Sequence, residues 1–330
     1  MIDAIRENPD PPSGLQEAAI KGKLIPFVGA GASRLAGCPD WSQFADRALG
    51  FFVDRGKLTH GQLAQIGRLN PRVKLSIALG LEKEHRLKID FGKILHPGPR
   101  HDNVKGRQLY ENLSKLAKTF VTTNYDEWLD ETLGTPVPST IGTPNPATPA
   151  LGARRTVIYE ANDLTPDKLR SNTVIHLHGS VCNPATMILT TQHYLNHYSN
   201  DRLRRGNEQE NNVLTFLEFL FSHRNVLFVG YGLEELEILE YVIVKARLNG
   251  RSGSKEMRHF LLQGFFSHEQ EIARSLKSYY EECGIELIPF LLDYKSWDQL
   301  IDVLDKFAKL APANDPLKIQ ILSEMEALLE

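Results

Sequence analysis

Ten residues near the N-terminus, Leu24–Ser33 (LIPFVGAGAS), constrain the fold more than any other part of the chain. The first five of these residues, Leu24–Val28, are apolar without alternation, which is typical of a strand buried on both faces of a parallel sheet. Two glycines and other small residues follow at once. A strand that runs into such a turn lets backbone N–H groups approach a phosphate closely. The stretch therefore predicts a nucleotide-binding turn, or a tight turn that needs small residues only for packing.

Further apolar runs predict more strands, with helical patterns between them. They are Thr119–Thr123, Thr156–Tyr159, Val174–Leu177, Met187–Leu189, Asn225–Val229, His259–Gln263 and Ile285–Phe290. Strands that alternate with helices are typical of an α/β fold with a parallel sheet. Pro26 lies inside the first strand and lacks an N–H group, so we expect the hydrogen bonding of that strand to be interrupted there.

Residues 36–106 differ from the rest of the chain because they show helical spacing and no strand pattern. We predict that they form a helical subdomain inserted into an α/β domain made of residues 1–35 and 107–311. Gly92–Gly106 is expected to be a loop, and so is Thr135–Pro149, which is dense in Pro and Thr. Residues 312–330 are predicted to form a C-terminal helix, whose apolar stripe could serve assembly or pack on its own core.

Composition bounds the classes of function. The net charge is −3 over 330 residues, which gives no electrostatic argument for direct binding of nucleic acid or an anionic membrane. No apolar run approaches the roughly 20 residues that a membrane-spanning helix needs. Cys38, Cys182 and Cys283 are far apart, which argues against a disulfide framework and a structural zinc site. We expect a cytoplasmic protein with no membrane segment.

The glycine turn matches only part of the dinucleotide fingerprint G-x-G-x-x-G. Gly29 and Gly31 occupy the first two glycine positions, but Arg34 occupies the third. A hydride-transfer enzyme is therefore disfavoured, and a P-loop is excluded because no Gly-Lys-Ser/Thr follows. A second small-residue turn, Gly230–Gly232, follows a predicted strand. It could approach the adenosine half of a dinucleotide or be a simple turn.

Two polar motifs follow predicted strands, where ligands bind in open α/β sheets. In Thr122–Asp126 (TTNYD), Asn124 can orient a water or a ribose hydroxyl, and Asp126 can accept from an amide NH₂. Alternatively, these two residues cap a helix expected over Glu127–Leu133.

The second motif, Val174–Ser180 (VIHLHGS), contains two histidines. His176 and His178 are two residues apart and would share one side of a strand, but no third metal ligand with suitable spacing is evident, so we expect no metal. His178 at the strand end suits a general base, since its reference pKa near 6.5 allows proton abstraction at neutral pH. It could equally be a satisfied loop histidine, whereas His176 is expected to pack inside the sheet.

The order of these motifs, GAGAS, TTNYD, LHGS and a glycine turn after a strand, resembles the sirtuin family over roughly residues 23–232. The resemblance implies a Rossmann-like parallel sheet with helices on both faces, and NAD as the bound dinucleotide. It implies that the dinucleotide phosphates are cradled by Gly29, Ala30, Gly31 and Ser33. It further implies that Asn124 and Asp126 lie by the nicotinamide ribose and carboxamide, that His178 is the catalytic base, and that Gly230 lies near the adenosine end.

The chain also departs from the deacylase sirtuins. Their zinc module has four cysteines after the histidine, and only Cys182 is found in that region. The TTNYD form, Trp41 and Leu189–Tyr194 resemble the sirtuin-like domain of bacterial anti-phage defence systems, which hydrolyses NAD⁺ to ADP-ribose and nicotinamide.

This resemblance implies an NAD⁺ glycohydrolase that depletes cellular NAD. It also implies activation in a homo-oligomer or beside a separate partner such as a HerA-type ATPase or a short Argonaute. An NAD-dependent protein deacylase and a non-catalytic NAD or ADP-ribose sensor are the alternatives.

Overall fold

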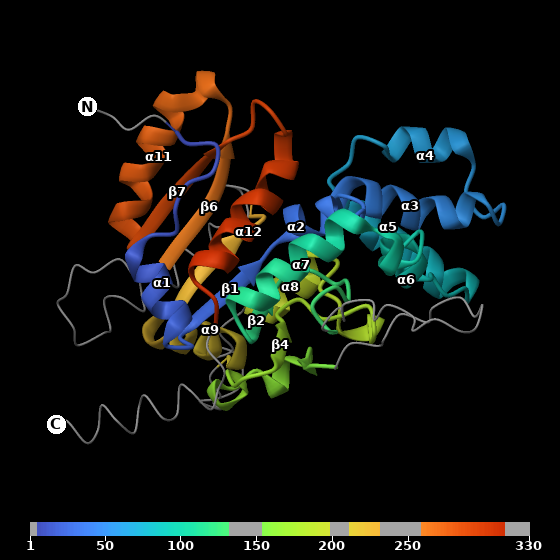
Figure 1. The fold of residues 1–330 in the computed structure, drawn as a ribbon. Helices are drawn as coiled ribbons and strands as arrows, with labels where there is room; N and C mark the ends of the chain where they lie inside the picture. Colours follow the sequence, from blue (N-terminus) through green and yellow to red (C-terminus); the bar gives the residue numbers. More distant parts are fainter. Residues whose placement is uncertain (1–4, 132–153, 199–210, 232–258, 314–330) are drawn as a thin grey trace, which may run out of the picture.

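The computed structural model describes residues 5–131, 154–198, 211–231 and 259–313. Its described residues contain a parallel sheet of seven strands in the order β3-β4-β2-β1-β5-β6-β7 (Figure 1). The strands are β1 (Leu24–Val28), β2 (Thr119–Thr122), β3 (Thr156–Ile158), β4 (Thr173–His176), β5 (Asn225–Val229), β6 (His259–Phe265) and β7 (Ile285–Leu291). The Rossmann-like α/β prediction is confirmed.

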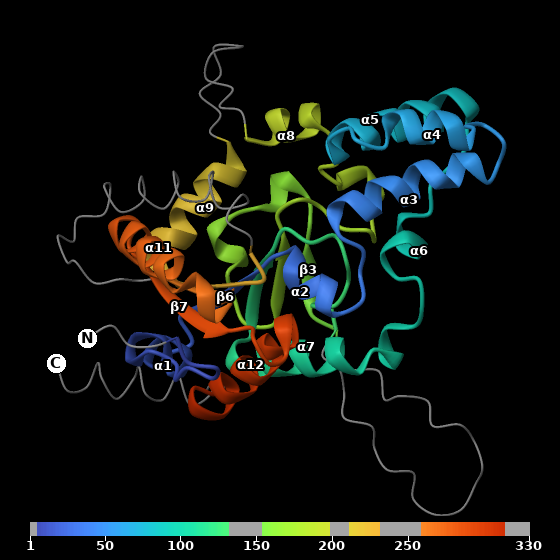
Figure 2. The same cartoon turned by 90° about the horizontal axis from the view of Figure 1, so that it is seen from above.

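Helices cover both faces of the sheet (Figure 2). One face packs against α1 (Ser13–Ile20), α7 (Val104–Leu116) and α12 (Gln299–Leu310), and the other against α9 (Asn212–His223) and α11 (Gln270–Cys283). Alternate residues of β1 serve the two cores, because successive side chains of a strand point to opposite faces. Leu24 and Val28 lie in the first core, and Ile25 and Phe27 lie in the second.

A group of helices follows β1 and lies to one side of the sheet (Figure 1). After the short α2 (Ala30–Leu35) come α3 (Trp41–Val53), α4 (His60–Ile66), α5 (Pro71–His85) and α6 (Phe91–Leu95). Capping boxes start α3 at Asp40 and α4 at Thr59, and Pro71 occupies the first turn of α5, where its missing N–H costs nothing. Buried residues of α3, α5 and α6 form a third core.

Several local predictions were wrong. Met187–Leu189 is not a strand but an extended segment, whose Met187 and Leu189 are buried in the third core. The expected loop 92–106 contains the end of α6 and the start of α7. Residues 127–131 are not helical, so Asn124 and Asp126 cap no helix in the described part of the chain.

Pro26 coincides with shortened strand pairing on only one side of β1, the side that faces β2. The strand pairs with β5 over its whole length, but with β2 only at Phe27 and Val28. The predicted loop 135–149, the Gly232 end of the second glycine turn, and the predicted C-terminal helix 312–330 lie wholly or largely outside the described residues. Within them, no helix is long and apolar enough to cross a membrane.

Candidate active site

The glycine turn joins β1 to α2 and packs directly on the carboxyl end of β5. Gly29 donates its N–H to the carbonyl of Val229 at 2.9 Å, and Gly31 donates to the carbonyl of Gly230 at 2.8 Å. A Cβ atom on Gly31 would lie 2.8 Å from the Gly230 oxygen, so the close packing itself requires glycine. These two N–H groups are therefore engaged inside the protein, while Ala30, at the start of α2, is partly exposed.

Gly230 is the opposing half of this contact. Its φ is +69°, and a Cβ atom there would lie 2.4 Å from the backbone nitrogen of Ala32. We expect Gly230→Ala to lower the free energy of unfolding by roughly 1–3 kcal/mol in a urea titration, because it adds backbone strain and a clash with α2. Gly80→Ala in the middle of α5 meets no atom within 4 Å and should instead stabilise by roughly 0.5–1 kcal/mol. Equal effects of the two substitutions would contradict the packing argument.

Asn124, Ser33 and Asp126 form a buried hydrogen-bond network beside the turn. Asn124 Nδ2 donates to the Gly29 carbonyl at 2.9 Å and to Ser33 Oγ at 2.7 Å. Ser33 Oγ in turn donates to Asp126 Oδ2 at 2.5 Å, and Asp126 Oδ1 accepts from the Trp128 N–H at 3.1 Å. Residues predicted from two motifs more than ninety positions apart are thus in contact at the carboxyl ends of β1 and β2.

Tyr110 of α7 lies beneath this network and was not predicted as a site residue. Its hydroxyl is 3.4 Å from Ser33 Oγ, and its ring stacks on Trp128 with centroids 5.3 Å apart. Burial and the neighbouring Asp126 charge raise the pKa of Tyr110, so the phenol stays protonated. Nothing in the helical pattern of α7 distinguishes this tyrosine from an ordinary core residue.

Tyr125, between the two network residues, points away from them. Its ring lies in the third core, 6.1 Å from the Phe44 ring and 5.9 Å from the Trp41 ring, centroid to centroid. Its hydroxyl donates to the carbonyl of Ile188 at 2.7 Å. One tripeptide therefore contacts both the glycine turn and the α3–α6 helices.

His176 is buried inside the sheet, as predicted, and holds both ends of the loop that carries the network. Its Nδ1 lies 2.8 Å from the Asn124 carbonyl oxygen and its Nε2 lies 2.8 Å from Asp130 Oδ1. A carbonyl only accepts, so Nδ1 carries a proton, and the carboxylate shares a proton with Nε2. Burial lowers the pKa of His176, but the hydrogen bond and charge of Asp130 outweigh it and raise the pKa overall.

His178 lies beyond the end of β4, in an enclosure made by α8 (Thr191–Tyr198). Its Nε2 is 2.8 Å from the Tyr198 hydroxyl, and its ring meets those of Tyr194 and His197 edge-on. Burial, followed by the charges of His197 and Arg72, lowers the pKa of His178 to about 3. The imidazole is therefore neutral at physiological pH, and no hydrogen bond joins it to Asn124 or Asp126.

This lowered pKa predicts an acid-sensitive contribution to stability. Because the folded-state pKa lies below the ordinary value of 6.5, the contribution is complete above pH 6.5 and is lost as the pH falls towards 3. At pH 5 the loss amounts to about 2 kcal/mol. Urea unfolding of the unsubstituted chain and of His178→Phe, each at pH 7.5 and pH 5, measures the contribution of His178 to the free energy of unfolding. We expect the stability of the variant to fall less on acidification, and equal falls would contradict the assignment.

Among the described residues, Glu127, Asp130 and Cys182 are close enough together to hold a metal ion. Their chemistry does not favour one. Cys182 Sγ already donates to Glu127 Oε1, and burial with this hydrogen bond raises the pKa of the thiol to about 11.

Comparison with known proteins identifies the family of this chain. A protein of Bacillus subtilis named Defense-associated sirtuin 2 is 23% identical over 296 residues, which are 87% of this chain and 25% of that protein. The chain thus spans about a quarter of the length of this curated relative. The family model described as SIR2-like domain matches residues 118–288, just over half of the chain, and this range includes Asn124, His176 and His178. The chain therefore belongs to the SIR2-like domain family.

Proposed function

We propose that this chain hydrolyses NAD⁺ to ADP-ribose and nicotinamide. The observation that carries the proposal is the buried network of Ser33, Asn124 and Asp126 beside the small-residue turn. It lies at the carboxyl edge of a parallel sheet, where ligands bind in open α/β folds. Membership of the SIR2-like family supports the use of NAD.

The chemistry needs few groups. Cleavage of the bond between nicotinamide and ribose builds positive charge on the sugar, as in glycoside hydrolysis, and the pyridinium leaves without a general acid. In the proposed site, the phosphates approach the turn formed by Gly29, Ala30, Gly31 and Ser33 at the partly exposed Ala30, because β5 engages the N–H groups of the two glycines. Gly230 lies towards the adenosine. No metal is required.

Asn124 and Asp126 have separate proposed roles. The Nδ2 group of Asn124 is fixed by the Gly29 carbonyl and Ser33, which sets the direction of its Oδ1 atom towards a ribose hydroxyl or the attacking water. The charge of Asp126 favours the developing cation, and each of its oxygens keeps a lone pair for the nicotinamide carboxamide.

His178 is the proposed base, and α8 limits the access of substrate to its ring. The Tyr198 hydroxyl occupies the hydrogen-bonding direction of Nε2 that a substrate hydroxyl or water would use. We propose that the isolated chain is weakly active and that assembly into a homo-oligomer, or a separate partner such as a HerA-type ATPase or short Argonaute, moves α8. The name of the Bacillus subtilis relative supports a defence role, which we propose is exerted through NAD depletion.

The test is incubation of the chain with NAD⁺ followed by product chromatography, over a range of protein concentrations and with candidate partners. We expect nicotinamide and ADP-ribose, with specific activity that rises with assembly. Formation of O-acetyl-ADP-ribose from an acetylated peptide would instead identify a deacylase. Binding of intact NAD⁺ without nicotinamide release in the assembled state would identify a sensor.

A further inference from the structure

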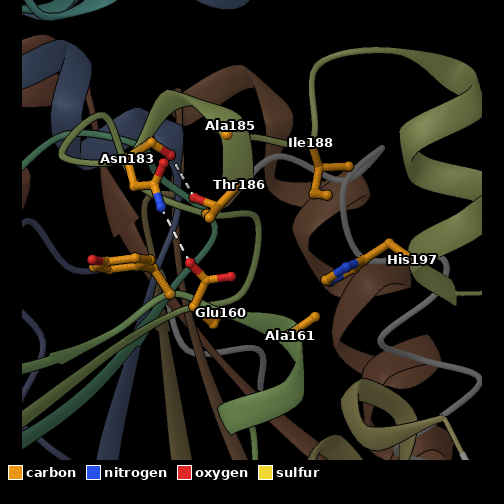
Figure 3. A pocket seen from close by; sticks show the side chains of 9 residues that line it. Glu160, Ala161, Asn183, Ala185, Thr186, Ile188 and His197 are labelled. Atoms are coloured by element: carbon orange, nitrogen blue, oxygen red, sulfur yellow. Dashed lines mark hydrogen bonds between the residues drawn. The ribbon is translucent and has the colours of Figure 1, made fainter.

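A pocket of about 210 Å³ opens next to His178, at the edge of the sheet formed by β3 and β4. Its walls come from the residues after β3, from the segment 183–188 and from α8. In Figure 3, Glu160 and His197 lie on opposite sides of this space, and the Glu160 carboxylate meets the side chain of Asn183. The ring of His197 lies 6.1 Å from that of His178, so the pocket adjoins the proposed base without including it.

The polar side chains on the Glu160 side are arranged as acceptors. Asn183 Nδ2 donates to Glu160 Oε1 at 3.1 Å (Figure 3), and because a carboxylate only accepts, this contact fixes which end of the amide faces Glu160. The Asn183 Oδ1 atom is then an acceptor on the same wall, together with the second carboxylate oxygen. The hydroxyl proton of Thr186 is already donated to the Asn183 carbonyl at 2.7 Å.

The opposite wall presents a further acceptor. The Leu177 carbonyl accepts a hydrogen bond from the His197 ring, while His197 Nε2 is buried and has no partner in the part of the chain that the structure describes. The bond to Leu177 therefore uses Nδ1, and a neutral ring leaves a lone pair at Nε2. Burial lowers the pKa of His197, which favours the neutral ring.

We propose that this pocket binds a guanidinium or primary ammonium group through Glu160, Asn183 and His197. Such a group offers several N–H donors and one positive charge. The pocket walls offer facing acceptors and one carboxylate, and they carry no Lys or Arg. The group could belong to a free polyamine-like molecule or to a basic side chain of a partner protein. The assignment is independent of NAD⁺ cleavage, because it concerns binding alone.

The test is isothermal titration calorimetry of the full chain with agmatine, which carries both a guanidinium and an ammonium group. We expect saturable binding that Glu160→Gln weakens by about tenfold, the effect of removing a charged hydrogen-bond partner. Glu160 is exposed, so this change should leave folding intact, and Glu84→Gln on the exposed face of α5 is the matched control. His197→Phe, which keeps the ring and removes the lone pair, should also weaken binding.

A second titration separates the two sources. Tighter binding of an end-blocked Gly-Arg-Gly peptide than of agmatine would indicate a partner's side chain, and the reverse order a free ligand. Either order supports the proposed chemistry. Absence of agmatine binding, equal affinity of Glu160→Gln and the unsubstituted chain, or binding of neutral ribose in place of agmatine would overturn it.

Discussion

Nicotinamide release by an Asn124→Ala variant is expected to be roughly 10²–10³-fold slower than release by the unsubstituted chain, the usual cost of removing one preorganised polar group from a catalytic site. Asn124 spans the Gly29 carbonyl and Ser33, so its removal also frees the Ser33–Asp126 pair to turn. The measurement is single-turnover release of nicotinamide in the assembled state, with NAD⁺ affinity determined separately.

The control for this substitution is Asn162→Ala, at an exposed position of the short helix Ala161–Asp163, which should release nicotinamide at the unsubstituted rate. His178→Ala should also be slower, by roughly 10²–10⁴-fold, because a positioned base is lost. If either Asn124→Ala or His178→Ala releases nicotinamide at the unsubstituted rate, the catalytic assignment is wrong.

The His176→Ala variant is expected to lose about 3–5 kcal/mol of stability, because the substitution leaves the buried Asp130 carboxylate without its partner. It also removes the donor to the Asn124 carbonyl, so the loop from Asn124 to Asp130 loses the contact that holds both of its ends. Urea unfolding gives the free energy. Folding raises the pKa of His176, so its contribution to the free energy of unfolding depends on pH. The contribution is complete below pH 6.5 and declines as the pH rises through the folded-state pKa.

Two further variants sharpen this measurement. His223→Ala, at the exposed end of α9, should change stability by less than about 1 kcal/mol. The His176→Ala/Asp130→Ala pair should cost less than the sum of its single substitutions, because the second change removes the stranded charge. Additive effects would show that the two side chains do not act as a pair.

Much of the fold could be predicted because its signals are local. Continuous apolar runs marked β1, β5 and β6, and helical spacing over residues 36–106 marked α3 to α5. Met187–Leu189 was mistaken for a strand because three apolar residues look the same whether they join a sheet or pack extended against helices. The expected helix after Asp126 failed for a similar reason, since Asp126 caps a turn at Trp128 rather than a helix.

The candidate site was predictable in its polar motifs but not in their connections. Asn124, Asp126 and Ser33 could be named from short motifs, because each follows a strand at the ligand edge. The holding role of His176 depends on Asn124 and Asp130, which are 52 and 46 positions away. The Tyr198 contact with His178 depends on how α8 packs, and sequence spacing carries no information on either. The need for glycine at position 230 likewise comes from the close packing of α2 on this residue, which the sequence does not show.

The placement of Tyr125 connects the candidate site to the α3–α6 helices. Asn124 and Asp126 are bonded to the sheet side of the molecule, while the ring between them is clamped by Trp41 and Phe44 of α3. A shift of α3 relative to the sheet would tilt that ring and twist the backbone on either side of it. Force applied to the outer surface of the helices, by a second copy or another protein, would thus reach the two polar side chains through Tyr125.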